Sequence, residues 1–242
     1  MAVKIYNVIN RGIRIRENGV FTAPELISDA GVFFEEAGGY YAGGNILVDG
    51  KEYAIFVEPI TDNYNMLLWS NESSSLSGTF SKFNGRQNTL VLVDNDISSF
   101  PAAQYCTSLS INGFSDWHLP APDELEVCYR YLNTNTTDYN TDIIDLHNQA
   151  NGYNPNSNPT GDGYQIDEPN PTTSPNFIDS SSNSYRATTG RSGTYWSSLP
   201  YDINSAWWQY FVNDDEYSNS GQQGFSSKTS TRNVRAVRWV EV

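Results

Sequence analysis

The residues best suited to acid–base chemistry cluster in Asp-Trp-His-Leu-Pro-Ala-Pro-Asp-Glu-Leu, residues 116–125. Its His118 is one of two histidines in the chain, the other being His147. Acid–base catalysis needs paired titratable groups in a cleft. The sequence has no G-x-S-x-G, phosphate-binding-loop or H-E-x-x-H motif, and no partner that would activate His118 is evident. We therefore expect a structural role for His118 and a protein without enzymatic activity.

A calcium site is the second chemistry that the residue types allow. Glu168-Pro169-Asn170 offers a carboxylate and an amide oxygen, which are suitable hard ligands for Ca²⁺. The tripeptide matches the E-P-N element of mannose-type C-type lectins, and Asn213-Asp214-Asp215 resembles their W-N-D element without its tryptophan. A single short motif in an Asn- and Pro-rich tract decides little. The expected cofactor is therefore none, with calcium at Glu168 and Asn170 as the alternative.

Two arginines stand in the apolar final segment, Asn-Val-Arg-Ala-Val-Arg-Trp-Val. A buried arginine needs a carboxylate partner, so Arg235 and Arg238 are expected to form structural ion pairs. The candidate partners are Asp116, Asp123 and Glu124.

Two helices are predicted in the middle of the chain. The first covers residues 96–110, with Ser98 or Ser99 as its cap and Pro101 in its first turn. The second follows Pro122, which suits a first helical turn. Its apolar stripe at i, i+3, i+4 and i+7 comprises Leu125, Cys128, Tyr129 and Leu132.

Cys106 and Cys128 fall on the apolar faces of these two helices, one on each. They make no metal-binding signature, so they form either two buried thiols or one disulfide. We favour free thiols, because nothing in the sequence indicates an oxidising compartment.

The remaining pattern is strand-like with long polar loops. Asp49-Gly50 between two apolar runs predicts a hairpin, and residues 61–88 are expected to be strand and loop. Residues 133–193 form a polar insertion with one short helix at 142–150. Further strands follow it, which gives an α+β order of short antiparallel strands, two helices and a long insertion.

The net charge of −14 argues against nucleic-acid binding, but the first residues are basic. Residues 1–29 are predicted to be a small N-terminal β arm with a turn at Glu17-Asn18-Gly19, and residues 30–242 the main domain. We expect the arm to anchor the protein through Lys4, Arg11, Arg14 and Arg16.

Targeting segments are not expected. The N-terminus shows no apolar signal-peptide core, and no apolar run approaches the ~20 residues that span a bilayer. We therefore expect a soluble protein made in a cytoplasm, without membrane insertion.

Five motifs, in one consistent order, resemble the Lcl C-terminal (DUF1566) domain. They are G-G-Y-Y-A-G-G-N-I-L-V-D-G-K-E-Y-A, G-F-S-D-W-H-L-P-A-P-D-E-L, Y-W-S-S, A-W-W-Q-Y-F and V-R-A-V-R, between residues 38 and 238. The resemblance implies a C-type-lectin-like fold, related to that of the formylglycine-generating enzymes. The polar insertion is similar to that of the tailed-bacteriophage variant. Structural roles are expected for Asp116, Trp117, Glu124, Trp196, Trp207, Arg235 and Arg238.

The motif A-W-W-Q-Y-F has a strand's alternation of faces. The family's shared positions, Trp207, Gln209 and Phe211, are expected to face inward, and Trp208 and Tyr210 outward as contact residues. The alternative is that both faces are covered and all these residues are core.

Polar loops near the C-terminus use residues typical of recognition surfaces, and equally of ordinary exposed loops. By analogy with phage tropism determinants of this fold, ligand binding is expected there. The candidate binding residues are Tyr201, Asp202, Asn204, Trp208, Tyr210, Asn213, Asp214, Asp215 and Tyr217.

These observations predict a non-enzymatic bacteriophage virion protein, a capsid decoration, head fibre or tail-associated protein at the virion surface. Its expected partners are other virion proteins, bound through the arm, and a host-surface glycan or protein, with a homotrimer as one possible state. A bacterial carbohydrate-binding adhesin is the alternative. A formylglycine-generating-type enzyme is less favoured, because the C-terminal third has no cysteine.

Overall fold

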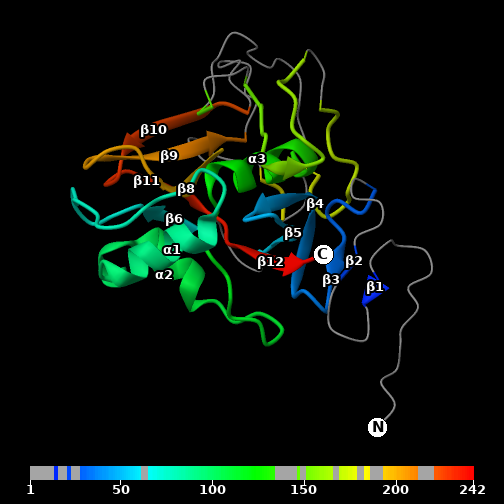
Figure 1. The fold of residues 1–242 in the computed structure, drawn as a ribbon, viewed down its shortest axis with the longest axis horizontal. Coiled ribbons are helices and arrows are strands. Elements are labelled where there is room, and N and C mark those ends of the chain that lie inside the picture. Colours follow the sequence, from blue (N-terminus) through cyan, green and yellow to red (C-terminus); the bar gives the residue numbers. More distant parts are fainter. Residues whose placement is uncertain are drawn as a thin grey trace.

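The computed structural model describes residues 14–15, 21–22, 28–60, 65–133, 146–147, 151–165, 169–178, 183–185, 193–211 and 221–242. Over these residues the chain has the α+β fold that the sequence predicts, with two five-stranded sheets, mostly antiparallel, and three α-helices (Figure 1).

The first sheet has the strand order β10-β9-β8-β11-β6. All its neighbours are antiparallel except β11 and β8, which pair in parallel through Asn233 and Tyr195. Its strands are β6 (Asn65–Leu68), β8 (Thr194–Pro200), β9 (Ser205–Tyr210), β10 (Gln223–Ser227) and β11 (Thr231–Val234).

The second sheet has the order β12-β5-β4-β3, with β7 also paired to β4. Its strands are β3 (Phe33–Phe34), β4 (Gly39–Val48), β5 (Lys51–Val57), β7 (Ser157–Asn158) and β12 (Val237–Glu241). The predicted hairpin is confirmed, because Asp49 and Gly50 join β4 to β5 with φ of 51° and 75°, the conformation that a tight hairpin turn requires.

Part of the N-terminal arm is described. β1 (Arg14–Ile15) and β2 (Phe21–Thr22) pair antiparallel in a two-stranded sheet of their own. They flank Glu17-Asn18-Gly19, the predicted turn, which lies outside the described residues together with Lys4, Arg11 and Arg16.

The helices differ from the prediction. α1 (Gly85–Asp94) was missed, since its start falls in residues expected to be strand and loop. The predicted helix at 96–110 is a 3-10 turn (Ile97–Ser99) followed by α2 (Pro101–Ser108). Neither serine caps α2, because Asp96 caps the 3-10 turn and Phe100 precedes Pro101 without a side-chain cap. The helix predicted at 142–150 lies mostly outside the described residues.

The third helix, α3 (Pro122–Leu132), lies between the two sheets. It packs on β4 of the second sheet and on β8 and β9 of the first. On the other face of the first sheet, α1 packs against β8 and α2 against β6, around buried Trp69, Trp117 and Trp196 (Figure 1). The residues around α3, Cys128 among them, form the first core, and those around Trp69, Trp117 and Trp196, Cys106 among them, form the second core. Both cysteines are free thiols, as predicted.

The two C-terminal arginines are held in different ways. Arg238 pairs with Asp116, a predicted partner, at 2.8 and 3.1 Å, and its guanidinium lies 4.0 Å from the Phe114 ring centre. Arg235 contacts none of the three predicted carboxylates. It donates to the backbone carbonyls of Glu58 and Asn183, and stacks over aromatic rings. Backbone carbonyls thus satisfy a buried guanidinium here.

Glu124, on the first turn of α3, joins four segments. Its completely buried carboxylate accepts hydrogen bonds from the backbone N–H groups of Gly85 and Ala121 and from the Trp239 indole. His118 Nε2 lies 2.9 Å from the same carboxylate. The first residue of α1 must be glycine, because a Cβ at Gly85 would lie 2.2 Å from a Glu124 oxygen.

We expect Glu124→Gln to lower the free energy of unfolding by about 3 kcal/mol or more, since the amide NH₂ would face two donors that now share one oxygen. Urea unfolding measures this. The matched control is Glu36→Gln in an exposed turn, for which little change is expected. Equal stability of the two variants would contradict the role given to Glu124.

Candidate functional site

Three aromatic side chains gather on the first sheet near its β10 edge. Tyr201 and Phe225 stack at 3.7 Å between ring centres with their planes 5° apart. Trp207 meets both rings edge-on, at 5.6 and 5.7 Å. Tyr201 is 49% exposed and Phe225 47%, so this trio, here called the aromatic surface, presents apolar faces to solvent.

The strands and a tight loop place these rings. Phe225 in β10 lies directly opposite Trp207 in β9, so their side chains share a face. Tyr201 follows the end of β8, in a loop closed by Asp202, which accepts from the backbone N–H groups of Asn204 and Ser205 at 2.8 and 2.6 Å. These hydrogen bonds, that from Asn204 first, lower the pKa of Asp202.

A buried lysine side chain also holds this loop in place. Lys228 donates to the carbonyl oxygens of Ser74 and Ile203, and its ammonium lies 4.9 Å from the Trp69 ring centre. Burial lowers the pKa of Lys228. The exposed Ile203 and Tyr201 therefore stand on a loop with an ordered base, a preorganised arrangement for binding.

The faces of β9 match the prediction only in part: Gln209 and, just past the strand, Phe211 are buried as expected. Trp208 was expected outward, but its ring packs on the second core and lies against Gly224, while the Arg232 guanidinium sits 4.7 Å from its centre. Trp207 was expected inward and instead belongs to the half-exposed aromatic surface. Gln209 on that same face is fully buried.

Other predicted binding residues have mixed placements. Tyr201, Asp202 and Asn204 lie together in one exposed loop, and Tyr210 is half-buried. The structure adds Phe225, which the sequence-based set omitted because the chain before it was assigned to a loop. Its pairing with β9 was the signal that could have revealed it. Asn213, Asp214, Asp215, Tyr217 and Glu168 lie outside the described residues.

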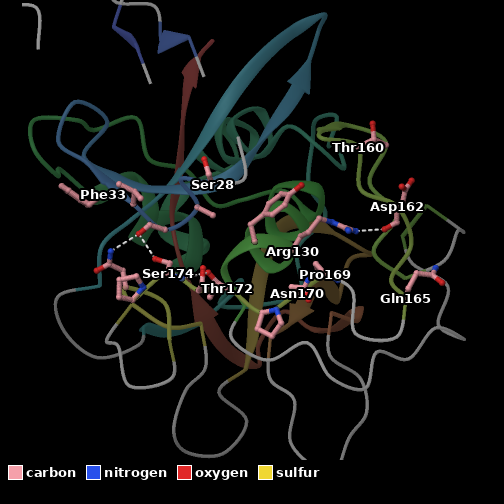
Figure 2. A pocket seen from close by; sticks show the side chains of 18 of the residues that line it. Ser28, Phe33, Arg130, Thr160, Asp162, Gln165, Pro169, Asn170, Thr172 and Ser174 are labelled. Carbon is pink, nitrogen blue, oxygen red and sulfur yellow. Dashed lines mark hydrogen bonds between the residues drawn. The ribbon is translucent and has the colours of Figure 1, made fainter. Parts of the chain in front are cut away.

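A groove of about 1230 Å³ forms a second candidate surface (Figure 2). Arg130, near the end of α3, lies between residues 28–33 on one side and residues 160–165 on the other. Tyr131 also lines the groove. Residues 169–176 complete the wall, with Asn170 of the E-P-N tripeptide among them. The described residues contain no cluster of three or more His, Cys, Asp or Glu side chains suited to a metal.

Hydrogen bonds fix both sides of this groove. Arg130 donates to the carbonyl oxygens of Gly152 and Asp162 at 2.7 and 2.6 Å. Ser174 and Asn176 both donate to the carbonyl of Gly31, at 3.1 and 3.0 Å. The groove is thus tied together across distant parts of the sequence.

Asp123 of the predicted acid–base cluster and the neighbouring Glu126 are buried and hydrogen-bonded. Asp123 accepts from Asn156 and lies 2.7 Å from His147 Nε2, while burial raises its pKa. Glu126 accepts from the Tyr164 hydroxyl and, at 2.6 Å, from Gln209. Through these contacts the two carboxylates hold separate parts of the fold together.

Together these features define an α+β domain with an ordered aromatic surface and a polar groove. The chain belongs to the Lcl C-terminal domain family, which matches residues 58–238. No curated protein and no solved structure matches it. Among the described helices, none has the length and apolar character needed to cross a membrane.

Glu58 makes stability depend on pH. Burial raises its pKa from an ordinary 4.5 to about 7, so the folded protein holds an extra proton between these values. The contribution of Glu58 to the free energy of unfolding is then fully present below about pH 4.5. It falls by about 3 kcal/mol as pH rises through about 7. Glu58→Gln should remove this loss of stability at high pH, which urea unfolding at pH 4.5, 6 and 8 measures. The exposed Glu72→Gln serves as control, and parallel pH curves for wild type and Glu58→Gln would contradict this assignment.

Proposed function

We propose that this chain is a non-enzymatic bacteriophage virion protein whose domain has a C-type-lectin-like fold and binds a glycan on the host surface. The observation that carries the binding role is the aromatic surface, where three rings in mutual contact leave apolar faces exposed. Family membership supports the lectin-like fold, and the basic arm supports attachment to a capsid or tail.

A sugar ring fits the chemistry of the aromatic surface. Pyranose rings have C–H faces that pack on aromatic rings and hydroxyl edges that need hydrogen-bonding partners. Here the rings are bordered by Asn204 and Ser73, whose side chains hydrogen-bond to each other at 2.7 Å, and by Asp202. Rigid aromatic side chains supply contact area at low cost in conformational entropy.

Trp207→Ala is expected to weaken glycan binding at least tenfold. Full burial of a large apolar side chain is worth about 1.5–3 kcal/mol, and the half-buried indole would lose roughly half of that directly and more through the displaced Tyr201 and Phe225 rings. A glycan array followed by titration calorimetry on any hit measures the change.

Leu90→Ala is the matched control, because Leu90 is a 52% exposed apolar side chain on α1 outside the aromatic surface. It should bind as wild type does. Unchanged binding by Trp207→Ala, or an array without any hit, would refute glycan recognition by the aromatic surface.

The arm has a separate test. Deleting residues 1–20 should remove the protein from assembled particles while the thermal unfolding of the remaining domain is unchanged. The Trp207→Ala variant should still be incorporated, because it leaves the arm intact. Incorporation of the truncated protein at the wild-type level would contradict anchoring, and absence of the full chain from purified particles would contradict the virion assignment.

A further inference from the structure

We propose that the groove between residues 28–33 on one side and residues 160–165 and 169–176 on the other binds an uncharged oligosaccharide, as a second saccharide site in addition to the aromatic surface. This deepens the proposed function and rests on it, since it assumes a carbohydrate-binding protein. Ligand sites for single small molecules measure about 300–1,000 Å³. At about 1230 Å³ the groove has room for several linked sugar units.

The charge of the lining favours an uncharged chain. The protein carries a net charge of −14, yet the described residues that line the groove include one cationic side chain, Arg130, and one carboxylate, Asp162. The guanidinium of Arg130 already contacts two carbonyl oxygens and the carboxylate of Glu126. The groove therefore offers little net charge to an anionic or a cationic polymer.

The wall at residues 169–176 is unsuited to a peptide strand. Its three prolines, at positions 169, 171 and 175, have no N–H to donate. Between them, Thr172 N–H donates to the Asn133 carbonyl and Ser174 N–H to the Thr172 hydroxyl. A strand added here would lack the main-chain ladder that gives such complexes their affinity.

Side chains, in contrast, offer what a saccharide needs. Exposed hydroxyl and amide groups line the groove at Thr160, Gln165, Asn170 and Thr173, and the Tyr131 ring is also part of its lining. Figure 2 shows Thr160, Gln165 and Asn170. Tyr131 packs against β4 where Gly43 and Gly44 lie, and a Cβ at either glycine would come within 2.6–2.8 Å of it. The ring is thus set in place before anything binds.

The test is titration calorimetry with a panel of uncharged hexasaccharides: maltohexaose, cellohexaose, mannohexaose and hexa-N-acetylchitohexaose. A galacturonate hexamer and decaproline serve as the anionic and peptide probes. At least one uncharged hexasaccharide should bind, and the triple variant Gln165→Ala, Asn170→Ala, Thr173→Ala should weaken it at least tenfold. All three side chains are exposed, so its melting temperature should match that of wild type. The single variant Gln165→Ala should weaken binding in the same direction.

The matched control, Gln87→Ala with Gln104→Ala, removes exposed amides from α1 and α2 and should bind as wild type does. Full binding by the triple variant, binding of only the anionic or peptide probe, or no binding at all would overturn the groove assignment. If Trp207→Ala alone abolishes binding, the groove proposal fails and the aromatic surface stands. If the triple variant alone abolishes binding, the groove stands and the aromatic surface fails.

Discussion

The rest of the structure depends on one buried carboxylate, that of Glu124. Burying a carboxylate is costly unless donors surround it, and here the donors come from α1, the start of α3, His118 and β12. No single segment provides enough of them, so the acid is stabilised only when all four are in place. These shared hydrogen bonds fix how α1 and β12 pack against α3. Only a glycine at position 85 leaves room for the Glu124 carboxylate oxygen.

Two further acids on α3 extend this principle to the candidate surfaces. Asp123 holds Asn156 and His147 of the polar insertion, and Glu126 holds Tyr164 on one side and Gln209 of β9 on the other. The insertion wall of the groove and the strand that carries Trp207 are therefore bound to the same helix. The buried acids of α3 thus link the layers of the fold through hydrogen bonds. A buried polar network of this kind stabilises a protein only when all its donors and acceptors are satisfied.

Structure is predicted best from the sequence where a residue type has a single physical requirement. Asp49-Gly50 specifies a turn with positive φ, and Arg238 needs an acid, which it finds in Asp116. Structure is predicted poorly where local preference and packing disagree. The Leu-Val-Leu-Val run of α1 is typical of a strand, yet Asn84 caps a helix there by accepting from Gln87 N–H. Leu92 belongs to the second core, and Val91 is also buried. Tertiary packing overrides propensity in this segment.

The partly exposed position of Trp207, which was expected to face inward, has a geometric cause. Alternation assigns adjacent residues to opposite faces of a strand, but it does not say how far each face is covered. On one face of β9, Gln209 is buried and donates to Glu126 of α3, whereas Trp207 is only partly buried. On the other face, Ala206 belongs to the second core and Trp208 packs against it. Both faces are thus partly core. The aromatic surface lies on a face of β9 where Gln209 is buried through Glu126 of α3 and Trp207 is not, so its exposure depends on packing between elements far apart in the sequence.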